Sequence, residues 1–323
     1  MAQLHHYVPR FLLRRFGTGK KEHLHTYDKS TGTIFSRAAT KLAANYNFYD
    51  FVFMGETMTL EPALADVEAK AGAHIARIIK ERRLNLADPL ERGELARFFA
   101  VQLVRTPAQH ATWKDAFARM EVWLRSEGMP EAYFVLDPRV GDGENSQRVA
   151  MARQILSAPE NFGTAFIEKD WVLFETGKAR PYMIGDHPLV MHNDEKSDLR
   201  GNVGLNVEGV QIYLPISPQL TLGMLCPSIG EGLLQQLGSA PVDTYKSGPF
   251  DLSLAARLVK AMRSGTPFDG GAESSSFFDA LQIANAERFV FSSDGNFALL
   301  KEMLASNPDL KKGRRMQEAG GKF

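Results

Sequence analysis

FIEKDWVLFET, residues 166–176, marks the point at which the pattern of the chain changes. Before it, apolar residues recur at the spacing of helices, whereas from residue 164 onward short apolar runs alternate with turn residues, as in strands. RPYMIGD (180–186), VQIYLPI (210–216) and LTLGML (220–225) continue the strand pattern. The later part of the chain is therefore predicted to contain a mainly antiparallel sheet.

Helices are predicted on both sides of this stretch. The first, residues 60–83, carries six apolar residues at helical spacing. The second, residues 88–105, begins at Asp88-Pro89, an N-cap residue followed by a proline suited to the first helical position. A fourth helix is expected to follow the loop GDGENS (141–146) and to end near Leu156. The predicted helices before the change are 60–83, 88–105, 107–126 and 147–156, and those after it are 251–264, 275–286 and 295–305, with a strand at RFVFSS (288–293).

The N-terminal region is predicted to form a β-hairpin. HLHTYD (23–28) alternates in polarity, KSTG supplies a turn, and TIFSRA (33–38) returns. The predicted fold class is α+β, with an N-terminal β-hairpin, a helical middle region and a C-terminal mainly antiparallel sheet with flanking helices. We expect one domain over residues 1–308, with a possible internal boundary near 157–164, and a basic mobile tail over 309–323.

Composition restricts the class of protein. Lys plus Arg and Asp plus Glu number 38 each, so no net charge draws the whole chain to nucleic acid or lipid. Residues 1–50 hold eight Lys/Arg and three acids, a local charge of 8 − 3 = +5. Cys226 is the single cysteine, which excludes an internal disulfide. With no signal peptide and no long apolar run, the chain is expected to be cytoplasmic, with no membrane contact.

The first candidate site is HHYVPRFLLRRF, residues 5–16. His5 and His6 precede Val8-Pro9, which favours extended backbone. One histidine could act as a metal ligand or as a general acid or base, and Arg10 could hold an anion. The alternative is an N-terminal strand docked on the domain, with its histidines hydrogen-bonded to backbone.

The second candidate site is YMIGDHPLVMHN, residues 182–193. Asp186 and His187 follow a predicted strand, and a carboxylate and an imidazole at a strand end are well placed for chemistry. The alternative is a turn in which Asp186 accepts backbone N–H groups and Pro188 stiffens the bend.

The third candidate site joins two predicted helices. Glu61 and Glu68 are seven residues apart, hence on one side of the first helix, while Gln102 and Arg105 share a core-facing stripe of the second. A buried arginine needs a partner, and Glu61 or Glu68 is the nearest candidate. Either this is a structural polar network, or Glu68 is a ligand or base and Arg105 binds an anion.

The order of several short segments resembles the bacterial family named domain of unknown function 4238. These segments are HHYVPRFLLRRF, NFY at 47–49, the glutamate-bearing helix, VQLVRTP at 101–107, GDHPL at 185–189 and LPISP at 214–218. The resemblance implies no activity and no catalytic residue, because none is established for the family. It supplies a shortlist that coincides with the three sites: His5, His6, Pro9, Glu61, Glu68, Gln102, Arg105, Asp186 and Pro188.

Three functions remain open from the sequence. In the first, His6, Glu68 and Asp186 are catalytic and bind a divalent Mg²⁺, Mn²⁺ or Zn²⁺ ion that activates water to hydrolyse a phosphodiester or nucleotide, as in a nuclease. The residues expected to bind substrate are His5, Arg10, Gln102, Arg105 and His187. In the second, the protein is a non-catalytic module in which the same groups bind an anion or organise the fold. Its basic N-terminal region then faces a partner, for which a nucleotide or nucleic acid is the candidate. In the third, the groups are structural.

Overall fold

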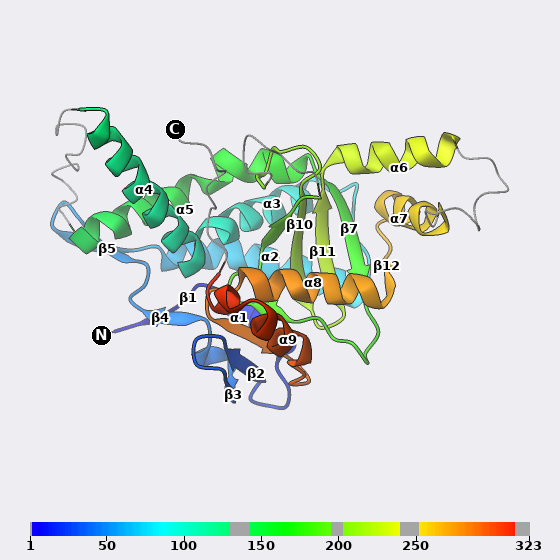
Figure 1. The fold of residues 1–323 in the computed structure, drawn as a ribbon, viewed down its shortest axis with the longest axis horizontal. Helices are drawn as coiled ribbons and strands as arrows, with labels where there is room; N and C mark the ends of the chain where they lie inside the picture. The colour runs from blue at the N-terminus through cyan, green and yellow to red at the C-terminus, as the bar shows by residue number, and fades with distance from the viewer. Residues whose placement is uncertain (1, 130–142, 195–202, 240–251, 314–323) are drawn as a thin grey trace.

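The computed structural model describes residues 2–129, 143–194, 203–239 and 252–313, and its fold is α+β, as predicted (Figure 1). The helices are α1 (Arg10–Phe16), α2 (Glu61–Glu81), α3 (Pro89–Val104), α4 (Pro107–Ser126), α5 (Gly143–Ile167), α6 (Pro227–Ser239), α7 (Leu252–Ser264), α8 (Gly271–Asn285) and α9 (Ala298–Ser306), with short 3-10 turns η1 (Ala39–Lys41) and η4 (Pro308–Lys311). The strands are β1 (Leu4–His6), β2 (His23–Asp28), β3 (Thr33–Ala38), β4 (Ala44–Tyr46), β5 (Asp50–Phe53), β6 (Glu56–Thr59), β7 (Asp170–Glu175), β8 (Ile184–Gly185), β9 (Val190–His192), β10 (Gln211–Ser217), β11 (Leu220–Leu225), β12 (Phe268–Asp269) and β13 (Phe289–Ser292).

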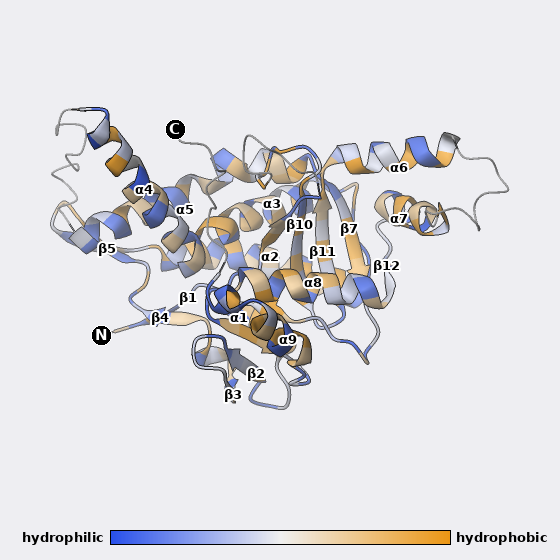
Figure 2. Ribbon diagram, in the orientation of Figure 1, coloured by the Kyte–Doolittle hydropathy of each residue, from blue (hydrophilic) through white to orange (hydrophobic). Residues whose placement is uncertain are grey.

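A five-stranded sheet of order β12-β7-β11-β10-β9 forms the centre of the molecule. Its pairs are antiparallel except for β12, which runs parallel to β7. Both faces of the sheet are covered. Along β10, Tyr213 packs against Phe278 of α8, while Leu214 points to the opposite side, as strand alternation requires. Figure 2 accordingly shows the central strands as largely hydrophobic.

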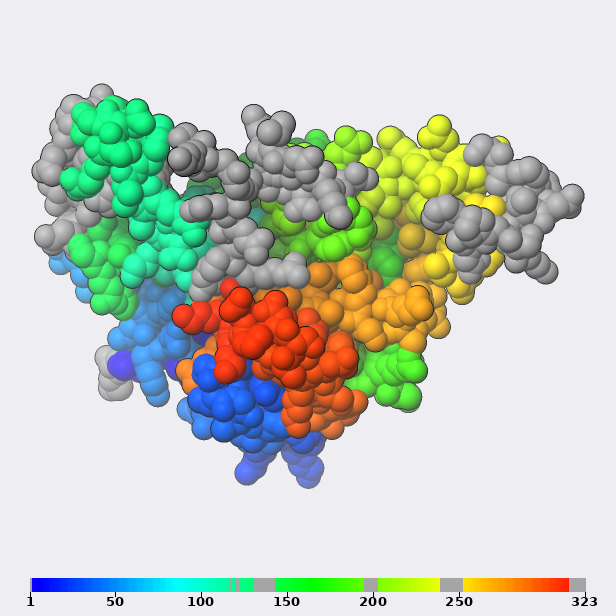
Figure 3. Space-filling view, in the orientation of Figure 1, coloured from blue at the N-terminus to red at the C-terminus, as the bar shows by residue number. Residues whose placement is uncertain are grey.

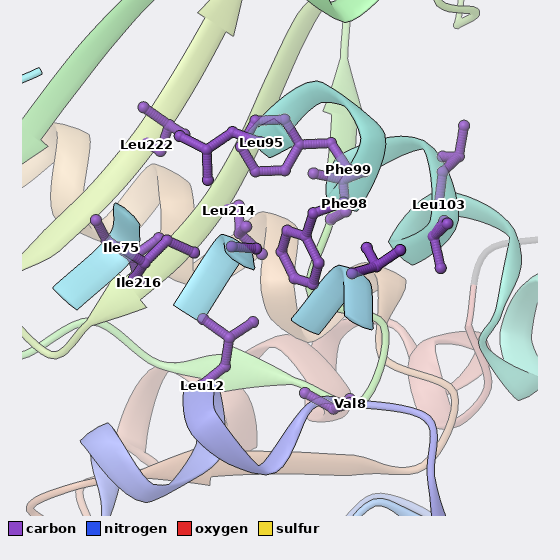
Figure 4. Close-up of a cluster of buried hydrophobic side chains, with 14 of the residues drawn as sticks. Val8, Leu12, Ile75, Leu95, Phe98, Phe99, Leu103, Leu214, Ile216 and Leu222 are labelled. Carbon is purple, nitrogen blue, oxygen red and sulfur yellow. The ribbon is translucent and has the colours of Figure 1, made fainter. Parts of the chain in front are cut away.

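The main core lies between this sheet and helices α1, α2 and α3. Figure 4 shows Leu12 of α1, Ile75 of α2 and Phe98 of α3 converging on Leu214 of β10. All four side chains are fully buried. Burial of such side chains contributes roughly 1.5–3 kcal/mol each. The core therefore fixes the N-terminal segment against α2 and α3, where the candidate residues lie.

A four-stranded sheet of order β3-β2-β13-β8 joins the two ends of the chain. The predicted hairpin is β2–β3, with Asp28 opposite Thr33. Strand β13 pairs antiparallel with β2, with Phe289 opposite Asp28, and on its other edge with β8. Figure 3 shows the N-terminal and C-terminal segments side by side on the surface.

Several elements differ from the prediction. Helix α5 begins at Gly143, inside the expected loop, and continues past Leu156 through Pro159 to Ile167, so residues 157–164 are helical. Packing against α3 offsets the lost hydrogen bond, since Ile155 and Ala158 of α5 are buried. Helix α6 was not predicted.

The expected tail begins within η4, and its residues 314–323 lie outside the described part of the chain. Within the described residues, every helix is too short or too polar to cross a bilayer.

Candidate functional site

The opening histidines lie on β1, which pairs antiparallel with β4. His5 is opposite Asn45 and His6 is opposite Ala44, and the Tyr7 N–H donates to the Ala43 carbonyl at 2.9 Å. The N-terminal segment is thus a strand docked on the domain. The next residues enter α1, where Leu12, Leu13 and Phe16 are buried.

His5 is buried and is bonded to backbone. Its Nδ1 accepts the Tyr49 N–H at 3.1 Å, and its ring stacks on the Tyr49 ring, with centroids 5.8 Å apart. Two carboxylates lie at longer range, because Nδ1 is 3.9 Å from Glu61 Oε1 and Nε2 is 3.9 Å from Asp50 Oδ1. Burial raises the pKa of Glu61, an effect that the nearby His5 and Arg105 oppose. His5 therefore holds the β4–β5 connection against β1.

His6 is half-buried beside a guanidinium–carboxylate pair. Burial lowers the pKa of His6, and the nearby Arg10 lowers it further, while Glu68 has the opposite effect. The ring is therefore neutral near pH 7. The backbone of Thr40 is hydrogen-bonded to the ring, and Nε2 is buried with no hydrogen-bond partner among the described residues. A neutral imidazole with a free nitrogen can accept a proton or a hydrogen bond.

Arg105 is the most heavily bonded residue of the site, although only 1% of its surface is exposed. Its Nη2 donates to Glu68 Oε1 at 2.7 Å and to the His6 carbonyl at 2.5 Å, and its Nε donates to the Tyr49 hydroxyl at 3.2 Å. Burial disfavours its charge, yet Tyr49 and Glu68 together raise the pKa of Arg105. Of the two partners expected from sequence, Glu68 is the one that pairs with it.

Gln102 precedes Arg105 by one helical turn and also bonds to the N-terminal segment. Its Nε2 donates to the Tyr7 carbonyl at 3.2 Å. Gln102 is fully buried, and its Oε1 has no hydrogen-bond partner in the described part of the chain. Gln102 of α3 and Arg105, the C-cap residue that follows the helix, thus hold the backbone of residues 6 and 7.

Asp186 is buried in a separate arrangement at the end of β8. Its two carboxylate oxygens accept the N–H groups of Glu287, Arg288 and Phe289 at 2.6, 2.9 and 2.9 Å. Burial raises the pKa of Asp186 to about 6 in spite of these three bonds. The carboxylate does accept backbone N–H groups, but from the start of β13 rather than from its own turn.

His187 contacts the residue next to Arg105 of the third candidate site. Its Nδ1 lies 2.6 Å from the hydroxyl of Thr106, the residue that follows Arg105 and caps α4. The loop after β8 therefore contacts the short connection between α3 and α4. Burial raises the pKa of Tyr7, and the charge of Asp186 acts in the same direction.

The expected residues are therefore only partly brought together. His5, His6, Glu61, Glu68, Gln102 and Arg105 meet around β1, and Arg10 lies within electrostatic range of His6. The expected metal site is not formed. No group of three or more His, Cys, Asp or Glu side chains in the described residues could hold a metal ion, His6, Glu68 and Asp186 included. Asp186 is engaged by backbone donors, and two guanidinium groups beside His6 disfavour another cation.

Two tyrosines of the site were not predicted. Tyr49 donates its hydroxyl hydrogen to the Arg105 carbonyl at 3.2 Å and contacts both His5 and Arg105, and burial raises its pKa to about 12. Tyr7 is buried, and its ring lies against that of Phe48, with centroids 5.9 Å apart. The segment NFY at 47–49 and the position of Tyr7 beside the histidines were the available signals, but neither specifies a partner.

Comparison with known proteins identifies the family. A family model described as a protein of unknown function, DUF4238, matches residues 4–296. The chain belongs to this family. No curated protein and no solved structure matches the chain.

Proposed function

We propose that this member of the DUF4238 family is a non-catalytic module that binds nucleic acid through a basic face in its N-terminal region. The basic face consists of seven exposed or half-exposed cationic side chains: Arg10, Arg14, Arg15, Lys20, Lys21, Arg37 and Lys41. The observation that carries the proposal is that none of the seven forms an ion pair with any described residue.

Nearby acids do little to neutralise this face. Residues 10–41 contain two acids, Glu22 and Asp28. Asp28 is buried and its carboxylate is bonded to Arg288 at 2.7 Å. Burial lowers the pKa of Arg15, and the neighbouring Arg14 lowers it further. A local excess of positive charge in a chain of zero net charge is expected to attract a polyanion.

The fold supports these cations on one substructure. Helix α1 packs against η1 and β2, and it buries Leu12, Leu13 and Phe16 in the core (Figure 1). Arg10 and Arg14 lie one turn apart on its exposed side. Because the apolar side of α1 is occupied by the core, it has no apolar surface to insert into a bilayer. Phosphate groups of a nucleic acid are therefore the favoured ligands over a lipid surface.

The polar groups of the candidate site favour a structural role over a catalytic one. Arg105, Gln102, His5 and Asp186 each bond to backbone groups that lie far away in the sequence. They hold β1 to α3 and β8 to β13. In this proposal Gln102 and Arg105 hold in place the segment that leads into α1, the helix that carries Arg10 and Arg14.

Fluorescence anisotropy with short labelled RNA, single-stranded DNA and duplex DNA tests the proposal. Arg10→Glu/Arg14→Glu is expected to weaken binding at least about tenfold, since phosphate contacts dominate affinity. The control is Lys80→Glu/Lys260→Glu, which reverses two exposed lysines on α2 and α7 and is expected to change affinity less than about threefold. Equal losses in both variants, no binding by the wild type, or equal affinity for anionic vesicles would contradict the proposal.

The same samples test the hydrolase hypothesis. The labelled oligonucleotides are incubated with wild-type protein and Mg²⁺, Mn²⁺ or Zn²⁺, and their length is measured on a denaturing gel. Under the proposal they stay intact. Metal-dependent cleavage that persists through purification and is lost in Glu68→Gln would replace binding alone with catalysis.

A further inference from the structure

Cys226 lies at the join between β11 and α6, outside the site described above (Figure 1). Strand β11 ends at Leu225 and α6 begins at Pro227, so the cysteine directly precedes the N-terminus of a 13-residue helix. Its N–H donates to the Val210 carbonyl at 2.8 Å, which continues the β10–β11 ladder by one bond. The thiol is free and the residue is partly exposed to solvent. Partial positive charge at a helix N-terminus favours the thiolate form of a cysteine.

A hydroxyl group supports the sulfur. Ser228 Oγ donates to Cys226 Sγ at 3.1 Å. Such a bond stabilises the thiolate more than the thiol, because a charged acceptor binds a donor more strongly than a neutral one. Although burial alone would raise the pKa of Cys226, hydrogen bonds from Ser228 and from the Gly209 backbone outweigh it, and the charge of Lys169 acts with them, so the pKa is lowered.

A buried lysine is the second, independent feature of this position. In the β7–β11 pair, Asp170 lies opposite Leu225. Lys169 and Cys226 are therefore opposite each other, one position beyond the ladder, and opposite residues project their side chains to the same face. Lys169 is 6% exposed, yet its ammonium group forms no hydrogen bond or ion pair with any described residue. A buried cation needs a partner, and a thiolate at Cys226 would supply one.

The neighbouring acid lies on the other face of the sheet. Asp170 is opposite Leu225, whose side chain belongs to the core cluster that includes residues of α7 and α8. Cys226 packs instead against the main core, together with Trp171 of β7. Strand alternation therefore turns the Asp170 carboxylate away from the face that Lys169 and Cys226 share.

We propose that Cys226 is a modification site, a thiolate that a hydroperoxide oxidises to a sulfenic acid. The sulfur attacks one oxygen of hydrogen peroxide and forms an S–O bond as the O–O bond breaks, and the departing hydroxide takes a proton from solvent to become water. The sulfur loses two electrons and the peroxide gains them. Because the chain has no second cysteine, the sulfenic acid condenses with a small free thiol, which releases water and leaves a mixed disulfide. This site is independent of nucleic-acid binding.

Trapping of the sulfenic acid with dimedone, followed by mass spectrometry of the adduct, measures the rate of oxidation by hydrogen peroxide at pH 7. The same cysteine in the urea-unfolded chain is the reference. We expect the folded protein to react at least about threefold faster, because its surroundings increase the thiolate fraction. The pH profile of alkylation by iodoacetamide should also lie at lower pH in the folded protein than in the unfolded chain. A folded rate equal to or below the unfolded rate would overturn the proposal.

Two variants separate the contributions to this reactivity. Lys169→Met removes the buried charge and Ser228→Ala removes the hydrogen bond to sulfur, and each is expected to slow oxidation at least about threefold. The control is Lys301→Met, which removes an exposed lysine of α9 and is expected to keep the rate within about 1.5-fold of wild type. Circular dichroism checks that each variant is folded. A rate that neither Lys169→Met nor Ser228→Ala changes, or equal slowing in the control, would refute the site.

Discussion

Glu68 and Arg105 form an ion pair of 2.7 Å in which the arginine is 1% exposed and the glutamate 24% exposed. Breaking such a pair from one side leaves a buried charge without compensation. We expect Glu68→Ala to lower the free energy of unfolding by about 3 kcal/mol, as measured by urea denaturation.

The control for this prediction lies on the same helix. Lys70 and Asp66 form a 3.1 Å pair whose side chains are 44% and 54% exposed. Lys70→Ala is expected to cost less than about 1 kcal/mol, because exposed pairs contribute little. Similar losses in the two variants would mean that Arg105 finds another partner.

Asp279 of α8 predicts a pH dependence of stability. Burial raises the pKa of Asp279 to about 7, although its carboxylate accepts the Met183 N–H at 2.7 Å. Since this pKa exceeds the unfolded value of about 3.9, the stabilising contribution is present below pH 4 and is lost as the pH rises through 7. Asp279→Asn keeps the hydrogen-bond acceptor and removes the charge. The difference in free energy of unfolding between this variant and the wild type should therefore shift by about 2–4 kcal/mol in favour of the variant from pH 5 to pH 8. Urea unfolding of both proteins at pH 5 and at pH 8 measures this difference. A difference that is the same at the two pH values would count against the prediction.

Asp186 should respond to the same substitution in the opposite way. Its carboxylate faces three backbone N–H donors, from Glu287, Arg288 and Phe289. An asparagine amide would turn its own N–H₂ toward these donors and leave at least one of them unpaired. Asp186→Asn is expected to cost about 2–4 kcal/mol in thermal or urea unfolding at pH 7. A variant as stable as wild type would show that these bonds are dispensable.

The salt dependence of nucleic-acid binding should report the basic face directly. Each phosphate contact contributes about one to the slope of log affinity against log salt concentration. Arg10→Gln/Arg14→Gln is therefore expected to reduce the slope by about two, while Lys80→Gln/Lys260→Gln leaves it unchanged. Anisotropy titrations over a range of KCl concentrations measure the slope. A slope that does not change would place the contacts elsewhere.

Local patterns in the sequence were sufficient for the elements that local physics determines. The apolar spacing of Leu64, Val67, Ala71 and Ile75 gave α2, and all four are buried. Asp88 caps α3 by accepting the Leu90 and Glu91 N–H groups, as its position before a proline indicated. The β2–β3 hairpin formed around its turn residues.

Elements stabilised by distant partners could not be predicted from local patterns. The sequence around Pro159 indicates a break, yet packing against α3 keeps α5 continuous. The site shows the same limit. Helical spacing indicated that Arg105 needed a carboxylate, and Glu68 provides it, but nothing local to Asp186 indicates that its donors are residues 287–289. Helical spacing was therefore enough to predict the arginine–glutamate pair. It was not enough to show that backbone donors occupy the Asp186 oxygens, so the predicted metal site was not formed.

The pairing of β2 with β13 has a consequence for biosynthesis. Tyr27 lies opposite Val290, so the hairpin cannot pair with β13 until all the residues between them have been synthesised. Until then, one edge of the hairpin has no partner and can pair with other nascent chains. Closure between such distant segments is slow. The four-stranded sheet is thus expected to form late in folding, and a chaperone that shields the early hairpin should raise the yield of folded protein.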